Sequence, residues 1–135
     1  MRCSPPFSDR SGSAAVEFAI VGPVFILMLV AMVVYGGWFW LAQSVQTTAS
    51  EAARAAVAGL DEAERDSLAQ AIAARSHSVG LEPERLSLAV RSEAGVLTVD
   101  AAYDASDHPV MMLKGLLPAP PVLIQRSAVI RAGGA

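Results

Sequence analysis

The chain has 135 residues, a formal net charge of −3 and a single cysteine, Cys3. Its length predicts one folded unit, the lone cysteine excludes an intramolecular disulfide, and no basic patch stands out that would favour nucleic acid as a partner. Apolar residues make up 53% of the chain, and their distribution is uneven because one long run lies near the N-terminus.

Residues 1–12 form a short polar leader, rich in proline, serine and glycine, for which we expect no regular structure. Two arginines, Arg2 and Arg10, precede the apolar run, and the first basic residue after it is Arg54. Because basic residues that flank a span are retained on the cytoplasmic side, this asymmetry predicts a cytoplasmic N-terminus and an extracytoplasmic remainder.

The apolar run begins at Phe18 and ends at Ala42, and its 25 residues include no charge, no amide and no hydroxyl except the phenol of Tyr35. As a helix it would be about 37 Å long, enough to cross the roughly 30 Å hydrocarbon core of a bilayer. A chain this small could not surround such a helix in water. The run is therefore predicted to cross a membrane once.

Three features stand out within this span. Pro23 predicts a kink, either tolerated near the helix start or required for packing in a filament. Gly36 and Gly37 suggest a flexible joint. They are followed by Trp38-Phe39-Trp40, which we expect to form an aromatic belt at the outer interface rather than a ligand-binding cluster.

The boundary before the span carries the sequence Gly12-Ser13-Ala14-Ala15-Val16-Glu17-Phe18, with an acid at the mouth of the apolar run. An ordinary secretory signal has a shorter apolar core, with small residues after it. An ionised carboxylate costs about 2.5–3.5 kcal/mol at the bilayer centre and less near an interface. Glu17 could therefore also be a structural residue that snorkels to the headgroups.

This heptapeptide resembles the processing site of type IV prepilins. The resemblance implies that a membrane prepilin peptidase cuts after Gly12 on the cytoplasmic side, so that Ser13 becomes the N-terminus and Glu17 the fifth residue. The common version of the motif has phenylalanine first, and Ser13 favours the tight-adherence (Flp, type IVb) branch. Residues 14–23, followed by residues 43–58, are similar to TadE-like pseudopilins of that branch.

Electrostatics supports the same motif. Cleavage would create an amine at Ser13, about one helical turn from Glu17. In an assembly of parallel helices, the amine of one subunit could neutralise Glu17 of a neighbour, which is favourable because an unpaired carboxylate is costly in lipid. Such a pair would fix the axial register between subunits.

The helix is predicted to continue to residue 58, because residues 43–58 are rich in strong helix formers and no breaker precedes Gly59. Small apolar residues recur along one face of this extension, and they would let another helix or a sheet approach closely. This stripe consists of Leu41, Val45, Ala49, Ala52, Ala56 and Gly59 or Leu60.

A glycine C-cap at Gly59 and a capping box formed by Asp61 and Glu64 predict a second helix, which runs to about His77 and is ended by Gly80. Apolar residues at helical spacing predict its buried face. They are Leu68, Ala69, Ile72, Ala73 and Val79.

Alternating apolar and polar residues predict three strands, at 86–91, 97–103 and Leu123–Arg131, with a hairpin turn at Glu93-Ala94-Gly95. The connection before the third strand is expected to form one or two helical turns, whose apolar residues pack under the sheet or face a partner. These are Met111, Met112, Leu113, Leu116 and Leu117. The predicted fold class is α+β and pilin-like, with a long N-terminal helix, a second helix and a small antiparallel sheet.

The sequence offers no arrangement typical of an enzyme or of a cofactor site. His77 and His108 are far apart, with no cysteine near either, which argues against a metal site. No glycine-rich phosphate loop and no nucleophile elbow is present. We expect neither catalysis nor a bound cofactor.

The chain is thus predicted to divide into a cytoplasmic leader (1–12), a transmembrane and projecting helix (13–58) and a small extracytoplasmic domain (59–135). We expect a TadE-like pseudopilin or minor pilin. Its partners would be the prepilin peptidase, other pilins or pseudopilins, the pilus assembly platform and the lipid bilayer. The alternative is an uncleaved, signal-anchored envelope protein with a partner-binding extracytoplasmic domain.

Overall fold

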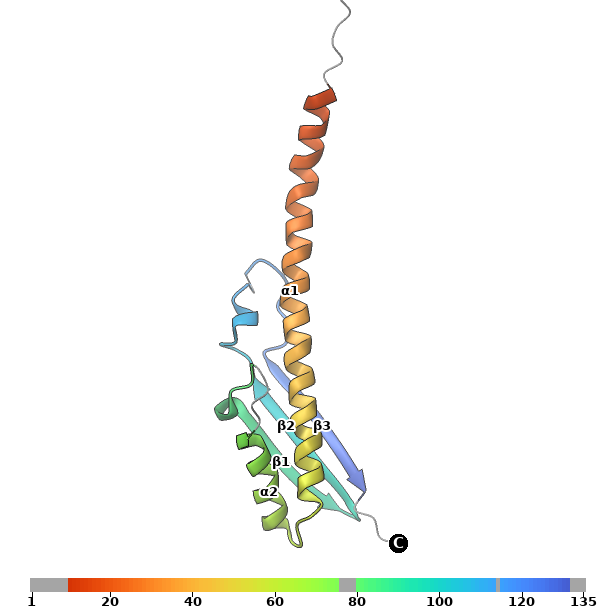
Figure 1. Cartoon of the computed structure of the whole chain (residues 1–135), viewed down its shortest axis with the longest axis vertical. Helices are drawn as coiled ribbons and strands as arrows, with labels where there is room; N and C mark the ends of the chain where they lie inside the picture. The colour runs from red at the N-terminus through yellow and green to blue at the C-terminus, as the bar shows by residue number, and fades with distance from the viewer. Residues whose placement is uncertain (1–9, 76–79, 114, 132–135) are drawn as a thin grey trace, which may run out of the picture.

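The computed structural model describes residues 10–75, 80–113 and 115–131. A helix of 47 residues, α1 (Arg10–Ala56), projects from a small head that is built on its C-terminal half (Figure 1). The head consists of a second helix, α2 (Glu62–Arg75), two 3₁₀ turns, η1 (Pro83–Arg85) and η2 (Pro109–Met111), and three strands, β1 (Leu86–Glu93), β2 (Val96–Asp104) and β3 (Leu123–Arg131). The predicted α+β fold class is confirmed.

Helix α1 is longer than expected at its N-terminal end. It begins at Arg10, so residues 10–12 of the predicted leader are helical, whereas residues 1–9, with Cys3, lie outside the described residues. At ~1.5 Å per residue the helix is about 70 Å long. It ends at Ala56, close to the predicted end.

The small-residue stripe of α1 is confirmed as its buried face. The residues of this stripe are all buried, including the glycine that follows the helix: Leu41, Val45, Ala49, Ala52, Ala56 and Gly59. This face contacts β2, β3 and α2, and α2 in turn covers β1. Alanine allows the sheet and α2 to approach α1 closely, and the large buried side chains of the core come mainly from the sheet: Leu97, Val99, Tyr103 and Ile124.

Gly59 has a different role from the predicted one. Its φ is not positive, so it is not a left-handed C-cap. A Cβ at this position would instead lie 2.7 Å from the backbone nitrogen of Arg65. The glycine is required because the start of α2 passes against the end of α1.

Helix α2 begins with the predicted cap, in a modified form. The N–H of Glu64 donates to Asp61 Oδ1 (2.7 Å), as in a capping box, but the Glu64 carboxylate accepts from the N–H of Leu60 (2.8 Å). The described helix ends at Arg75, and the predicted end at His77 and the stripe residue Val79 lie outside the described residues. The predicted face is confirmed where it is described, with Ala69 and Ala73 buried and Leu68 and Ile72 half-buried.

The three strands form one antiparallel sheet in the order β1-β2-β3, so the central strand is β2. Ala94 (φ 49°) and Gly95 (φ 76°) form the predicted hairpin turn between β1 and β2. Positive φ at both central positions is the geometry that matches the twist of the paired strands. The register pairs Leu88 with Ala101, and Val99 with Ala128, which brings the predicted apolar faces together.

The connection between β2 and β3, residues 105–122, is named the strap here. Packing under the sheet, the favoured prediction, is confirmed only for Met111, which joins the buried core together with residues of the sheet; the other apolar residues of the strap do not, because α1 and α2 cover that face. The strap lies instead beside α1, and it extends above the strands toward the N-terminal half of the helix (Figure 1). Within it Met111 is buried, while Met112 and Leu116 are exposed.

Candidate processing and assembly site

The predicted processing site lies in the first turns of α1, far from the head (Figure 1). Gly12, Ser13 and Glu17 are all exposed. Nothing lies within 4 Å of the position that a Cβ on Gly12 would occupy. Ser13 and Glu17 are four residues apart and therefore lie on the same side of the helix, about 6 Å apart along its axis.

Gly12 is helical in this structure, whereas an extended backbone is expected at a scissile bond. Only the first turn of α1 would have to unwind to expose that bond. Helix termini fray readily because their first N–H groups lack intrahelical partners, and glycine is a weak helix former. The helical start is therefore compatible with entry into a protease cleft after local unwinding.

The carboxylate of Glu17 faces outward at the start of the apolar run. None of the three ion pairs among the described residues includes Glu17. Glu17 is thus available to a cation supplied by another chain.

Beyond Glu17, the helix presents large apolar side chains on all sides. In the most apolar stretch of 18 residues, only 6% of the residues are buried inside the protein. A helix that is apolar all around and uncovered by its own chain matches a lipid environment or neighbouring apolar helices. By length and composition, α1 fits a single-pass membrane anchor.

The two features expected to perturb the span leave α1 continuous. The helix passes through Pro23 without interruption, and it also continues through Gly36 and Gly37. No break marks the expected joint. Gly37 has a packing role instead, since a Cβ there would lie 2.8 Å from Val110 Cγ2 in the strap. Gly36 faces open space.

Two aromatic residues at the end of the span bind the head, and two others are exposed. The hydroxyl of Tyr35 donates to the Pro118 carbonyl (2.6 Å), and the indole N–H of Trp38 donates to the Pro121 carbonyl (2.9 Å). Phe39 and Trp40 are exposed, whereas Ala42, the predicted end of the span, is buried in the core of the head. Sequence reasoning missed the role of Tyr35, although a lone phenol in an apolar run was a usable signal.

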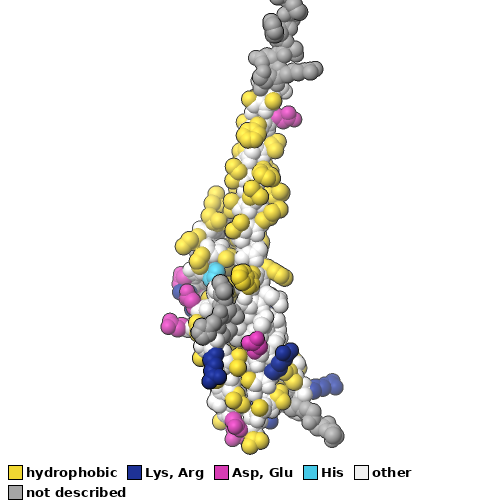
Figure 2. All heavy atoms as spheres, in the orientation of Figure 1, with side chains coloured by type: hydrophobic (Ala, Val, Ile, Leu, Met, Phe, Trp, Pro, Cys, Tyr) yellow, Lys and Arg dark blue, Asp and Glu magenta, His cyan; other side chains and the backbone are white. Residues whose placement is uncertain are grey.

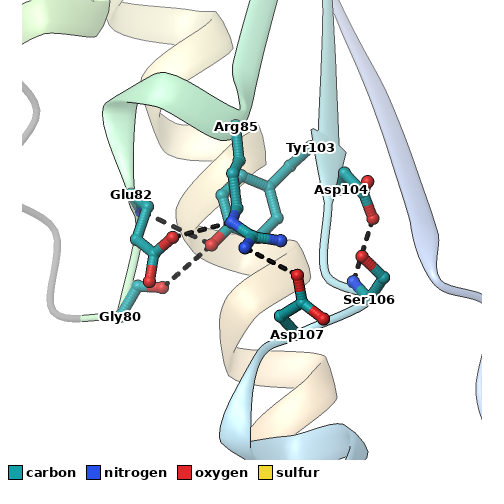
Figure 3. A network of polar contacts seen from close by, with 7 residues as sticks. All are labelled: Gly80, Glu82, Arg85, Tyr103, Asp104, Ser106 and Asp107. Carbon is teal, nitrogen blue, oxygen red and sulfur yellow. Dashed lines mark hydrogen bonds and ion pairs between the residues drawn. The ribbon is translucent and has the colours of Figure 1, made fainter.

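A polar network holds the base of the strap (Figure 3). The Arg85 guanidinium pairs with Asp107 (2.8 Å) and with Glu82 (2.7 Å). The hydrogen bond to Asp107 is the main cause that raises the pKa of Arg85 above its ordinary value. Nearby, the Tyr103 hydroxyl donates to the carbonyl of Gly80 (3.4 Å). The start of the strap is thereby tied to the segment that precedes β1.

Asp104 is the last residue of β2 and lies at the other side of this network. Its carboxylate accepts from the N–H of Ser106 (2.9 Å), and this bond is the main cause that lowers the pKa of Asp104 (Figure 3). The sequence contains two histidines, and His77 lies outside the described residues. His108 caps η2 by accepting the Val110 N–H at Nδ1 (3.3 Å). No group of three metal-binding side chains occurs within residues 10–75, 80–113 and 115–131.

These observations define a helix-anchored α+β protein whose apolar helix is exposed in its first half and covered by a head in its second. Residues 12–54 match the family described as TadE-like protein, which confirms the resemblance over that segment. The family is associated with the tight-adherence pilus. The match begins at Gly12, includes Glu17 and ends inside α1, so it does not extend to the sheet. Searches of curated proteins and of solved structures gave no match.

Proposed function

We propose that this chain is a pseudopilin or minor pilin that acts in assembly of a tight-adherence pilus after a prepilin peptidase cleaves it behind Gly12. The observation that carries the proposal is the position of Gly12, Ser13 and Glu17 on exposed turns immediately before an exposed apolar helix. A TadE-like match over this segment supports it. The N-terminus would lie in the cytoplasm and the head outside the cytoplasmic membrane.

Glu17 would form the contact between neighbouring subunits. After cleavage the new amine of Ser13 would lie about one turn from Glu17 on its own helix and within reach of Glu17 on a parallel neighbour. Pairing is favoured because a carboxylate at the edge of hydrocarbon loses hydration and gains little from its own chain. The other exposed apolar residues of α1 would then pack against neighbouring pilin helices or lipid.

The head favours a minor or priming subunit over the bulk component of the fibre. The major pilins of this branch, as the family resemblance implies, are far shorter beyond the membrane helix. A head with a three-stranded sheet would cap or initiate a filament, or contact the assembly platform. These roles share the requirement that α1 remain free along its first half.

The cleavage step is tested by mass spectrometry of the N-terminus of protein purified from cells that contain the peptidase. We expect the mature chain to begin at Ser13, and we expect Gly12→Val to retain the leader. Gly36→Val is the matched control, because both glycines lie on α1 and an added Cβ would meet open space at either position. An intact Met1 in the wild-type chain would overturn processing and favour the uncleaved, signal-anchored alternative.

The assembly step is tested with Glu17→Gln, which keeps the size of the side chain and removes its charge. We expect normal membrane insertion, weaker association with other pilins and reduced pilus output. Glu51→Gln is the control, since Glu51 is an exposed acid on the same helix but outside the apolar run. Unchanged complex formation and unchanged pilus output would contradict the role of Glu17.

A further inference from the structure

The strap exposes large apolar side chains beside buried ones. Met111 is 2% exposed and anchors the segment, whereas Met112 is 79% exposed and Leu116 is 62% exposed. Leu113 and Leu117, the residues that follow each of these exposed side chains, are half-buried. One short segment of a small head therefore carries two largely exposed apolar side chains, and their meaning depends on what lies next to them.

Contacts with α1 fix the height of the strap along the helix. Tyr35 and Trp38 donate hydrogen bonds to the carbonyls of Pro118 and Pro121, as described above. Between these two positions on α1, Gly37 admits Val110 at close range. The strap is therefore held against residues 35–38 of the helix and is not a loose loop.

The same residues of α1 lie at the expected outer edge of the bilayer. If Glu17 marks the inner edge, a hydrocarbon core of about 30 Å accommodates roughly 20 helical residues. Counting from Glu17 places the outer edge near Gly37. The contacts that hold the strap thus surround the position at which α1 leaves the lipid.

The composition of the strap suits that position. In the sequence, residues 109–121 contain no acid, and Lys114 is their only charged residue. Figure 2 shows hydrophobic side chains continuing from the helix onto the upper part of the head. In that view the charged side chains lie below this zone, apart from one acidic group near the N-terminal end of the helix. The apolar surface is thus continuous with the predicted membrane span.

We propose that the strap is a second membrane contact, in which Met112 and Leu116 insert among the lipid acyl chains at the outer interface. Lipid is the occupant because the strap lies at the level of the membrane edge and adjoins a helix surface that is itself apolar and uncovered. The contact would fix the height and tilt of the head relative to the bilayer. This inference rests on the proposed membrane span of α1, but it does not depend on cleavage or on pilus assembly.

The test uses the full chain in lipid nanodiscs that hold one copy each, with Cys3→Ser as the background. An environment-sensitive fluorophore is attached to Met112→Cys, to Val24→Cys in the span and to Val129→Cys on β3. All three positions are exposed and apolar. Lipids that carry a quencher in the upper acyl chain then report which probes contact the hydrocarbon.

We expect the probes at 112 and 24 to lose most of their emission and the probe at 129 to keep it. Adding Leu116→Glu should reduce the quenching at 112 and leave that at 24 unchanged. Quenching at 24 without quenching at 112 would overturn the strap contact and leave the membrane anchor intact. Absence of quenching at both positions would overturn the anchor as well. Quenching at 112 that required more than one copy per disc would identify a second chain as the occupant and refute the proposal.

Discussion

The two halves of α1 are one continuous helix with opposite surroundings. From Gly12 to Val33 its side chains are exposed almost throughout, and they are mostly large: Phe, Ile, Leu, Met and Val. From Val34 to Ala56 one face is buried, and that face is built largely of alanine. Large apolar side chains can pack against lipid or against the helices of other chains. Small side chains instead allow other elements of the same chain to approach the helix closely.

The apolar run of α1 and the exposed part of α1 end at different residues. The apolar run ends at Ala42, yet Val34, Leu41 and Ala42 are buried by the head. The last two turns of the run therefore contact protein. The part of α1 that its own chain leaves uncovered ends near Val33, shortly before the strap reaches the helix.

The largest expected effect tests this division directly. Leu41→Ala removes a buried side chain from the core and should lower the free energy of unfolding of the head by about 2–5 kcal/mol. The same change at the exposed Leu29 should leave the head almost unaffected. Chemical unfolding of the full chain in detergent micelles, followed by circular dichroism, measures both. Equal losses would mean that the two halves of the helix are not distinct.

A second change acts where the halves meet. Gly37→Val would force a Cβ against Val110, and the overpacking should cost about 1–3 kcal/mol and push the strap away from α1. Gly36→Val is the control, because that position faces open space. Limited proteolysis within residues 105–122 provides the measurement. If cleavage of the strap is equally slow in both variants, Gly37 does not hold it in place.

A smaller effect is expected at the phenol that links the span to the strap. Tyr35→Phe removes the hydrogen bond to the Pro118 carbonyl and should cost about 0.5–1.5 kcal/mol. Faster amide hydrogen exchange in the strap, with unchanged exchange in the sheet, is the expected signature. Phe39→Leu, at an exposed aromatic on the same helix, should not change either rate.

The smallest effect concerns acid. The N–H of Ser106 holds the pKa of Asp104 below its ordinary value of 3.8, so the ionised form stabilises the fold. That contribution is present above pH 3.8 and is lost as the pH falls through the lower pKa of the folded state. Because this carboxylate is solvent-exposed, the effect should be slight. Asp104→Asn should differ from wild type at neutral pH, and the difference should shrink in strong acid; a constant difference across this range would refute it.

Periodic features could be predicted from the sequence with good accuracy. The stripe from Leu41 to Ala56, the alternation in β1 and β2, and the third strand are all confirmed. Each follows from side-chain spacing along one element, which is a local property of the chain. The segment Gly12 to Glu17 is recognisable in the same way, from residue types at fixed separations.

Features that depend on distant segments were not predictable in the same way. The roles of Tyr35 and Gly37 follow from a strap more than 70 residues further along the chain. The position of Gly59 just after α1 is typical of a C-cap, but it is the close approach of α2 that requires a glycine there. The apolar residues of the strap suggest a place under the sheet, and only the assembled head reveals that this face is already occupied.

The sequence by itself determined that one apolar helix begins behind a glycine and a glutamate and continues into an alanine-rich extension, since composition and spacing act within a single element. Only the tertiary structure decided where that helix passes from open surroundings to protein contact. The reason is physical: burial and close approach arise between segments that are remote in sequence, and no local pattern specifies which of them will meet.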